Sequence, residues 1–290
     1  MKLALSTVAC PDWTFEALAA FVEEAGYQGL ELRTFGSAST RFACDPALTD
    51  PDKVRRLLAA TGCEVACVAT STRFDDPITP PGIGHILSGT PQGVRETGWA
   101  VDLAARLEAP LVRVFGYQIP SNESRTSALS RIVDRLELAV ATARNTGVRL
   151  AIENGGSFPT AATLSELLDR VNNPLLGVAY SPAIAALAGE SVSAGINVLE
   201  EKLFSVKIKD WSHGKPCVLG EGESQAREAI DALGAAGFGG WVVYECDRAW
   251  LPAEADGREL LKKSARNYYG WIGGRRTAGG ALTSAAATRT

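Results

Sequence analysis

Residues 14–33 read TFEALAAFVEEAGYQGLELR, and this stretch contains one complete helix–strand unit. Residues 14–25 form an amphipathic pattern that predicts a helix. Gly26 follows the last turn, where glycine adopts the left-handed cap conformation at little cost. Residues 29–33 then form a short apolar run that predicts a strand. A helix that leads directly into such a strand is typical of proteins with a parallel sheet.

The same alternation recurs along the chain. Further helices are predicted at 51–61, 127–146 and 224–236, each followed by a glycine. The expected strands are 2–6, 29–33, 64–69, 111–115, 149–153, 176–180, 204–209 and 240–245. They lack clean alternation of polar and apolar residues, as strands covered on both faces do. Eight alternations close a parallel barrel, so the sequence predicts an α/β fold, a (β/α)₈ TIM barrel, as one domain over residues 1–272.

An open doubly wound sheet is the alternative fold. It predicts a G-x-G-x-x-G turn after an early strand, and the sequence has none. Two segments depart from the alternation. Residues 70–92 form a long stretch rich in Pro, Gly and Thr, which either shapes a pocket or is a passive insertion. Residues 273–290 are predicted to form a disordered C-terminal tail without a catalytic role.

Composition restricts the classes of function. The net charge is −4 and the basic residues are scattered, so we expect no nucleic-acid partner. The six cysteines have neither C-x-x-C spacing nor a Cys/His cluster, which favours reduced thiols over a zinc site. No apolar run approaches the ~20 residues of a membrane span, so we expect no membrane partner and a cytoplasmic location. A homo-oligomer remains open.

Two glutamates end apolar runs on strands that lie far apart in the sequence. Glu153 closes LAIE on the fifth predicted strand, and Glu245 closes WVVYE on the eighth. The carboxyl ends of barrel strands carry the working residues, so the two carboxylates can face each other there. Such a pair can hold a divalent ion or transfer protons. The alternative is a structural pair neutralised by Lys207 and Arg113.

Several motifs in a fixed order resemble one known family, the xylose isomerase-like TIM-barrel superfamily of sugar (phosphate) isomerases and epimerases. The motifs are FEAL at 15–18, AGYQGLELR at 25–33, APLVRVFG at 109–116, LAIEN at 150–154, GVAYSPA at 177–183, VKIKD at 206–210, LGEGE at 219–223, and GFGG at 237–240 before YE at 244–245. The resemblance extends from the first strand to the last helix. It implies the same barrel fold and an enzyme of carbohydrate metabolism.

The resemblance also implies a ligand set for one divalent metal: Glu, Asp, His and Glu on strands five to eight. This chain keeps the two glutamates as Glu153 and Glu245, but Ser181 stands at the position of the Asp and Lys207 at that of the His. An ammonium has no lone pair for a metal and carries its own positive charge. We therefore expect no native metal, with Lys207 in the place of the cation. A divalent ion (Mn, Mg, Co or Zn) bound by Glu153, Glu245 and a rearranged ligand set remains the alternative.

The leading functional hypothesis is an isomerase or epimerase, with a lyase as a variant, that removes a proton next to the carbonyl of a small sugar-like substrate. Its catalytic residues would be Glu153, Glu245 and Lys207. The predicted substrate-binding residues are Arg113, Ser181, Lys209, Trp211, His213 and Arg248. A non-catalytic binding barrel is the third hypothesis. The zinc-dependent endonucleases within the same superfamily are excluded, because this acidic chain has two histidines.

Overall fold

The computed structural model describes residues 1–35, 42–45, 50–77, 90–251 and 257–280, with the side chains of 274–280 left undescribed. Eight parallel strands close into a barrel in the order β1-β10-β7-β6-β5-β4-β3-β2. The strands are β1 (Lys2–Ser6), β2 (Gly29–Arg33), β3 (Glu64–Arg73), β4 (Leu111–Phe115), β5 (Arg149–Glu153), β6 (Leu176–Tyr180), β7 (Leu203–Ile208) and β10 (Trp241–Tyr244). This confirms the predicted TIM barrel.

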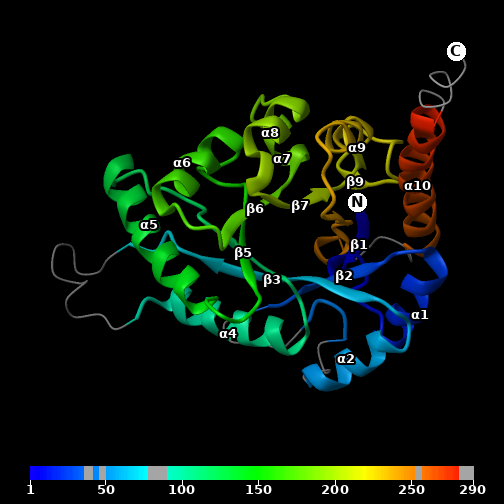
Figure 1. Cartoon of the computed structure of the whole chain (residues 1–290), viewed down its shortest axis with the longest axis horizontal. Helices are drawn as coiled ribbons and strands as arrows, with labels where there is room; N and C mark the ends of the chain where they lie inside the picture. The colour runs from blue at the N-terminus through cyan, green and yellow to red at the C-terminus, as the bar shows by residue number, and fades with distance from the viewer. Residues whose placement is uncertain (36–41, 46–49, 78–89, 252–256, 281–290) are drawn as a thin grey trace, which may run out of the picture.

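Helices surround the strands (Figure 1). They are α1 (Phe15–Ala25), α2 (Pro51–Ala59), α4 (Gln92–Arg106), α5 (Arg125–Thr142), α6 (Ala161–Val171), α7 (Pro182–Leu187), α8 (Val192–Leu199), α9 (Ala226–Ala235) and α10 (Arg258–Gly280). A hairpin of β8 (Trp211–Ser212) and β9 (Lys215–Pro216) follows β7. None of the helices within the described part of the chain is long and apolar enough to cross a bilayer.

The local sequence explains where most elements begin and end. The Thr14 side chain accepts a hydrogen bond from the Ala17 amide at the start of α1, and Gly26 closes that helix at φ 82°. The helix predicted at 127–146 lies at Arg125–Thr142, because Ser124 caps its start and Asn145 leaves the helical region at φ 61°. The predicted tail begins at 273, but the backbone of α10 is helical to Gly280. The rest of that tail, 281–290, and most of the predicted long stretch, 78–89, lie outside the described residues.

The barrel interior changes from apolar to charged along its axis. Ala4, Ala66, Trp241 and Val243 form a buried apolar cluster separate from the main core between strands and helices. Side chains two residues apart on a strand share a face. Glu245 lies two positions beyond Val243, so its side chain is on the same side of the strand and nearer the carboxyl end of the barrel. The apolar cluster fills the barrel interior nearer the amino ends of the strands. Polar side chains occupy the interior nearer the carboxyl ends.

Substitution of Gly177 in β6 tests how tightly the barrel strands pack against the segments that connect them. A Cβ at this position would lie 2.6 Å from the Lys202 carbonyl oxygen and 2.6 Å from the Phe204 ring. We expect Gly177→Ala to lower the free energy of unfolding by about 1–3 kcal/mol, because backbone must move to accept the methyl group. Gly239→Ala is the matched control, since nothing lies within 4 Å of its added Cβ. Equal stability of both variants in urea unfolding would contradict this packing argument.

Candidate active site

Lys207 lies at the centre of a buried group of charges where the strands end. Its side chain is fully buried on β7. Its Nζ atom donates to Glu245 Oε1 at 2.7 Å and to Glu153 Oε2 at 3.1 Å, and lies 3.4 Å from Glu31 Oε1. Arg113 Nε of β4 lies 3.1 Å from Glu153 Oε2. These five residues are called the Lys207 cluster below. Two cations and three carboxylates thus converge inside the barrel.

The charges of the Lys207 cluster favour the ionised forms of Lys207 and Glu245. Burial by itself lowers the pKa of Lys207, but the charges of Glu153, Glu245 and Glu31 outweigh it and raise that pKa above its ordinary value. Burial likewise opposes ionisation of Glu245, yet Lys207 and Lys209 hold its pKa well below the usual range. Lys207 is therefore an ammonium at neutral pH, which disfavours its use as a neutral amine nucleophile.

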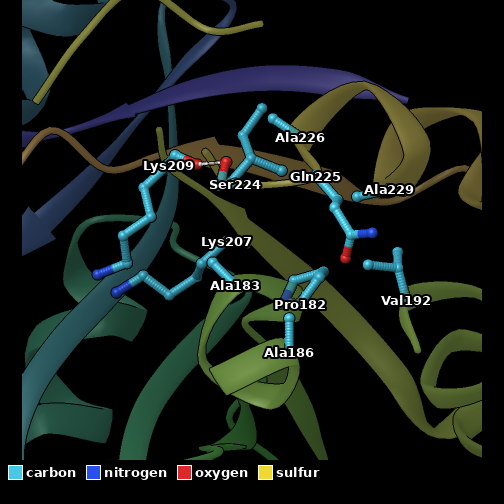
Figure 2. Close-up of a pocket in the computed structure, with 11 residues that line it drawn as sticks. Pro182, Ala183, Ala186, Val192, Lys207, Lys209, Ser224, Gln225, Ala226 and Ala229 are labelled. Atoms are coloured by element: carbon cyan, nitrogen blue, oxygen red, sulfur yellow. Dashed lines mark hydrogen bonds between the residues drawn. The ribbon is translucent and has the colours of Figure 1, made fainter. Parts of the chain in front are cut away.

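A second lysine extends the charge network toward solvent. Lys209 lies two residues beyond Lys207, so it lies on the same face of the chain. Its Nζ atom lies 3.0 Å from Glu245 Oε2 and 3.2 Å from Asp247 Oδ2. Figure 2 shows both lysine side chains extending in the same direction, with Pro182 and Ala183 at the start of α7 beside them. Burial, followed by the charge of Glu245, raises the pKa of Asp247 above its ordinary value.

Ser181 stands at the end of β6 with a hydroxyl group that has no hydrogen-bond partner among the described residues. The residue is fully buried, and its Oγ atom is unpaired. Its backbone is held firmly: the Asn154 side chain accepts from the Ser181 amide at 2.7 Å and donates to the Ser181 carbonyl at 3.0 Å. A buried hydroxyl without a partner is costly, so Ser181 is suited to hydrogen-bond a substrate oxygen.

An open cavity of about 310 Å³ lies beside the Lys207 cluster. Lys209, Glu245 and Asp247 line it together with Trp211 of the β8–β9 hairpin. The hairpin is fixed by the buried Asp210, whose carboxylate accepts hydrogen bonds from four backbone amides at 2.8–3.1 Å: Trp211, Gly220, Gly222 and Ser224. A volume of this size is in the range of small-molecule sites.

The structure brings most of the predicted site residues together but directs two of them elsewhere. Glu153 contacts both Lys207 and Arg113, and Lys207 also contacts Glu245. Lys209 and Trp211 line the cavity with Glu245, and Ser181 follows β6 at the same end of the barrel. His213 is exposed in the hairpin turn, and its amide donates to Glu223. The Arg248 guanidinium donates to the Ala9 carbonyl at 2.8 Å. Among contacts of the described residues, neither side chain meets the Lys207 cluster.

Glu31 is a member of the cluster that the sequence analysis did not select. It lies in the middle of β2, is 2% exposed, and accepts a hydrogen bond from the Ser6 hydroxyl at 2.8 Å. Arg33, at the end of the same strand, is not part of the Lys207 cluster. Arg33 instead donates to the carbonyls of Thr34 and Ala69, and burial lowers its pKa to about 10. The signal in the sequence that could have identified Glu31 is its position as a single carboxylate between the apolar residues Leu30 and Leu32.

The side chains of this site do not fit a divalent metal. Three carboxylates converge, but the point on which they converge is occupied by the Lys207 ammonium, which donates to Glu153 and Glu245, pairs with Glu31 and repels a cation. Within the described ranges, no group of three or more His, Cys, Asp or Glu side chains is arranged to hold a metal ion. Displacing Lys207 would leave the positive charge of Arg113 still in contact with Glu153.

Comparisons with known proteins agree with this architecture. A family model described as a xylose isomerase-like TIM barrel matches residues 19–267. An L-ribulose 3-epimerase structure has a TM-score of 0.78 at 18% identity and covers 100% of both chains. An IOLI protein with a bound zinc atom has a TM-score of 0.74 at 16% identity, covering 94% of this chain and 98% of its own. A probable 3-DHS dehydratase, AsbF from Bacillus anthracis, has 0.72 at 15%, covering 92% and 98%. No curated protein matches the chain by sequence.

Removing the ammonium should leave buried carboxylates without their counter-charge. We expect Lys207→Met to lower the free energy of unfolding by about 3–5 kcal/mol at pH 7. The pKa of Glu245 is lowered in the folded protein, so its stabilisation is present above the unfolded pKa of about 4.3 and is lost as pH falls. The difference between wild type and Lys207→Met should therefore shrink below about pH 4.

Lys202→Met is the matched control for this measurement. Lys202 forms an exposed ion pair with Asp169 at 2.5 Å, and its loss should change stability by less than about 1 kcal/mol. Urea unfolding of the three proteins between pH 3 and pH 8 gives the comparison. A Lys207→Met deficit that stays constant over this range would show that the cluster is not held by charge.

Proposed function

The chain belongs to the xylose isomerase-like TIM-barrel family, and from this premise we propose that it is an enzyme that transfers a proton next to the carbonyl of a small hydroxylated substrate. One observation carries the proposal: a buried ammonium lies between two carboxylates at the end of the barrel where such folds place their chemistry. Ammonium and carboxylates together supply an electrophile and two proton-transfer groups in one place.

The proposed step begins with a substrate whose carbonyl oxygen accepts a hydrogen bond from Lys207. One carboxylate, Glu153 or Glu245, takes the proton from the carbon next to the carbonyl. The electron pair of that C–H bond forms a carbon–carbon double bond, and one pair of the C=O bond moves onto the oxygen, which gives an enediolate whose negative charge is stabilised by the Lys207 ammonium. Return of a proton to the other face of that carbon gives an epimer. Return of a proton to the former carbonyl carbon, with the hydroxyl proton passing to the other oxygen, gives an isomer. Departure of a hydroxyl group from the next carbon as water, with the proton supplied by the protonated glutamate, instead gives a dehydrated product.

The resting contacts of Lys207 explain how a carboxylate of low pKa can act as a base here. In the resting site the ammonium donates to Glu245 and holds its pKa down. As the proton leaves carbon, one negative charge disappears from a carboxylate and one appears on the substrate oxygen. The ammonium can follow that charge through a small rotation of its side chain, and the net charge of the cluster and substrate together stays constant throughout the step.

The substrate class is proposed from the same residues and from the family. Lys209 and Trp211 line the cavity with Glu245, and Ser181 adds a buried hydroxyl group, unpaired among the described residues, at the end of β6. An ammonium, an indole and a hydroxyl group suit a sugar-like molecule with several oxygens. Arg113 is buried against Glu153, so its proposed role is to fix that carboxylate while it contributes positive charge. The names of the structural neighbours include both epimerases and a dehydratase, which is consistent with either outcome of the enediolate.

Deletion of either proposed base should abolish proton transfer without unfolding the barrel. We expect Glu153→Gln and Glu245→Gln each to lower the rate by about 10²–10⁴-fold, because general acid–base catalysis contributes about this much. The measurement is deuterium exchange in D₂O at the carbon next to the carbonyl, followed by NMR over a panel of C3–C6 ketoses. Exchange at the wild-type rate in both variants would show that neither glutamate is the base and that the proposed site is wrong.

Lys207 and a metal ion can be distinguished by restoring the ligand types that the family resemblance implies. The double variant Lys207→His with Ser181→Asp should bind roughly one equivalent of Mn²⁺ or Zn²⁺ in calorimetry. The wild type should bind neither ion at micromolar concentration, and a chelator should leave its deuterium exchange unchanged. Wild-type protein that purifies with about one equivalent of metal and loses exchange on chelation would support the metal-dependent alternative instead.

A further inference from the structure

The residues that line the cavity beside the Lys207 cluster are of two chemical kinds. Lys209, Glu245 and Asp247 are charged, and the lysine pairs with both carboxylates. Five others are apolar or aromatic and are called the apolar wall below: Ile184, Leu187, Trp211, Pro216 and Leu251. These residues come from α7, from the β8–β9 hairpin and from the end of η3 (Arg248–Trp250), so three connections contribute to one surface. The remaining charged residue at the cavity, Asp210, is used by four backbone amides.

Leu187 is the most exposed member of the apolar wall. Its side chain is 75% exposed at the last position of α7, the highest value among the large exposed hydrophobic residues of the described chain. A single exposed leucine is ordinary on a protein surface. This one differs because it borders a cavity that also contains Glu245, a proposed catalytic residue. A ligand that contacts Glu245 at one end can therefore cover the apolar wall with its other end.

The apolar wall discriminates against hydroxyl groups. Apart from the indole N–H of Trp211, its side chains offer no hydrogen-bond donor or acceptor. A substrate hydroxyl pressed against this surface gives up its hydrogen bonds to water without replacement, which disfavours a fully hydroxylated chain. An alkyl or aryl group in the same place is favoured because apolar area leaves water on both sides of the contact.

We infer that the natural substrate of this site is an amphipathic hydroxycarbonyl compound, with its reacting hydroxyketone or hydroxyaldehyde end at the Lys207 cluster and an apolar substituent of several carbons on the apolar wall. The inference rests on the proposed proton-transfer function, because a bound molecule is a substrate only if it reacts. It restricts the sugar-like class to molecules that lack hydroxyl groups at the distal end. The charged and the apolar lining residues of the one cavity thus select the two ends of one small molecule.

A series of 1-hydroxyketones tests the inference by binding alone. Dihydroxyacetone and 1-hydroxy-2-butanone have nearly the same shape and differ by a distal hydroxyl in place of a methyl group, and 1-hydroxy-2-hexanone adds two methylenes. Dissociation constants are measured by calorimetry on the full chain. We expect 1-hydroxy-2-butanone to bind more tightly than dihydroxyacetone, and each further methylene to improve affinity roughly fourfold. Equal affinities, or tightest binding of dihydroxyacetone, would overturn the inference.

Leu187→Ser should flatten this dependence on chain length. Leu138→Ser is the matched control, because Leu138 is also an exposed leucine, at 52%, but lies on α5 and does not line the cavity. The control should keep the full gain per methylene. If both variants flatten the series, or neither does, the apolar wall is not the binding surface. If Leu187→Ser changes the particle mass in solution, the wall is an interface between copies, and the inference is wrong.

Failure of this inference can be separated from failure of the proposed function. The binding series is repeated in the Glu153→Gln variant, which keeps the apolar wall intact. Chain-length dependence in a wild-type protein that exchanges no deuterium would refute the proton-transfer function but leave the apolar specificity. Loss of exchange in Glu153→Gln, together with a flat series in wild type, would support the function and refute the specificity.

Discussion

The buried ammonium of Lys207 is the interaction on which the site depends. An unpaired charge inside a protein costs several kcal/mol, so Lys207 can stay charged only where carboxylates surround it. The barrel provides them from strands that are distant in sequence: Glu31 on β2, Glu153 on β5 and Glu245 after β10. The requirement is mutual, since each of these carboxylates would be destabilised without the lysine. Charge balance, more than any single hydrogen bond, therefore holds this end of the barrel in one arrangement.

The apolar cluster lies next to the buried charges inside the barrel. It leaves space for the lysine side chain and excludes water. Ala4 and Ala66 are small, whereas Trp241 is large and fills the lower barrel with Val243. A lysine side chain has a long apolar stem, which can pack on such a layer while its amino group reaches the carboxylates above. Glu31 is in turn oriented by the Ser6 hydroxyl of the neighbouring strand β1. The apolar layer and the charged layer thus together accommodate the buried lysine.

Much of the fold and part of the site could be predicted from the sequence, for identifiable physical reasons. The barrel strands are short apolar runs between helices, and Glu153 and Glu245 stand out because each closes such a run. Glu31 was missed because it lies inside a run, where only the three-dimensional arrangement shows that it faces Lys207. Arg248 was misjudged for the opposite reason: it follows a strand end, but its guanidinium turns toward the Ala9 carbonyl. Proximity to a strand end does not decide which way a long side chain points.

The lysine and the apolar wall both contribute to stabilising the negative charge of an enediolate. An ammonium carries one positive charge and contacts an oxyanion through a hydrogen bond, so in water it would stabilise an enediolate only weakly. The attraction grows as the local dielectric constant falls. A substrate whose apolar end covers Leu187 and Trp211 would exclude water from the cavity that leads to Glu245 and Lys209. On this argument the apolar substituent contributes to the rate as well as to affinity, because it strengthens the single charge that the site uses.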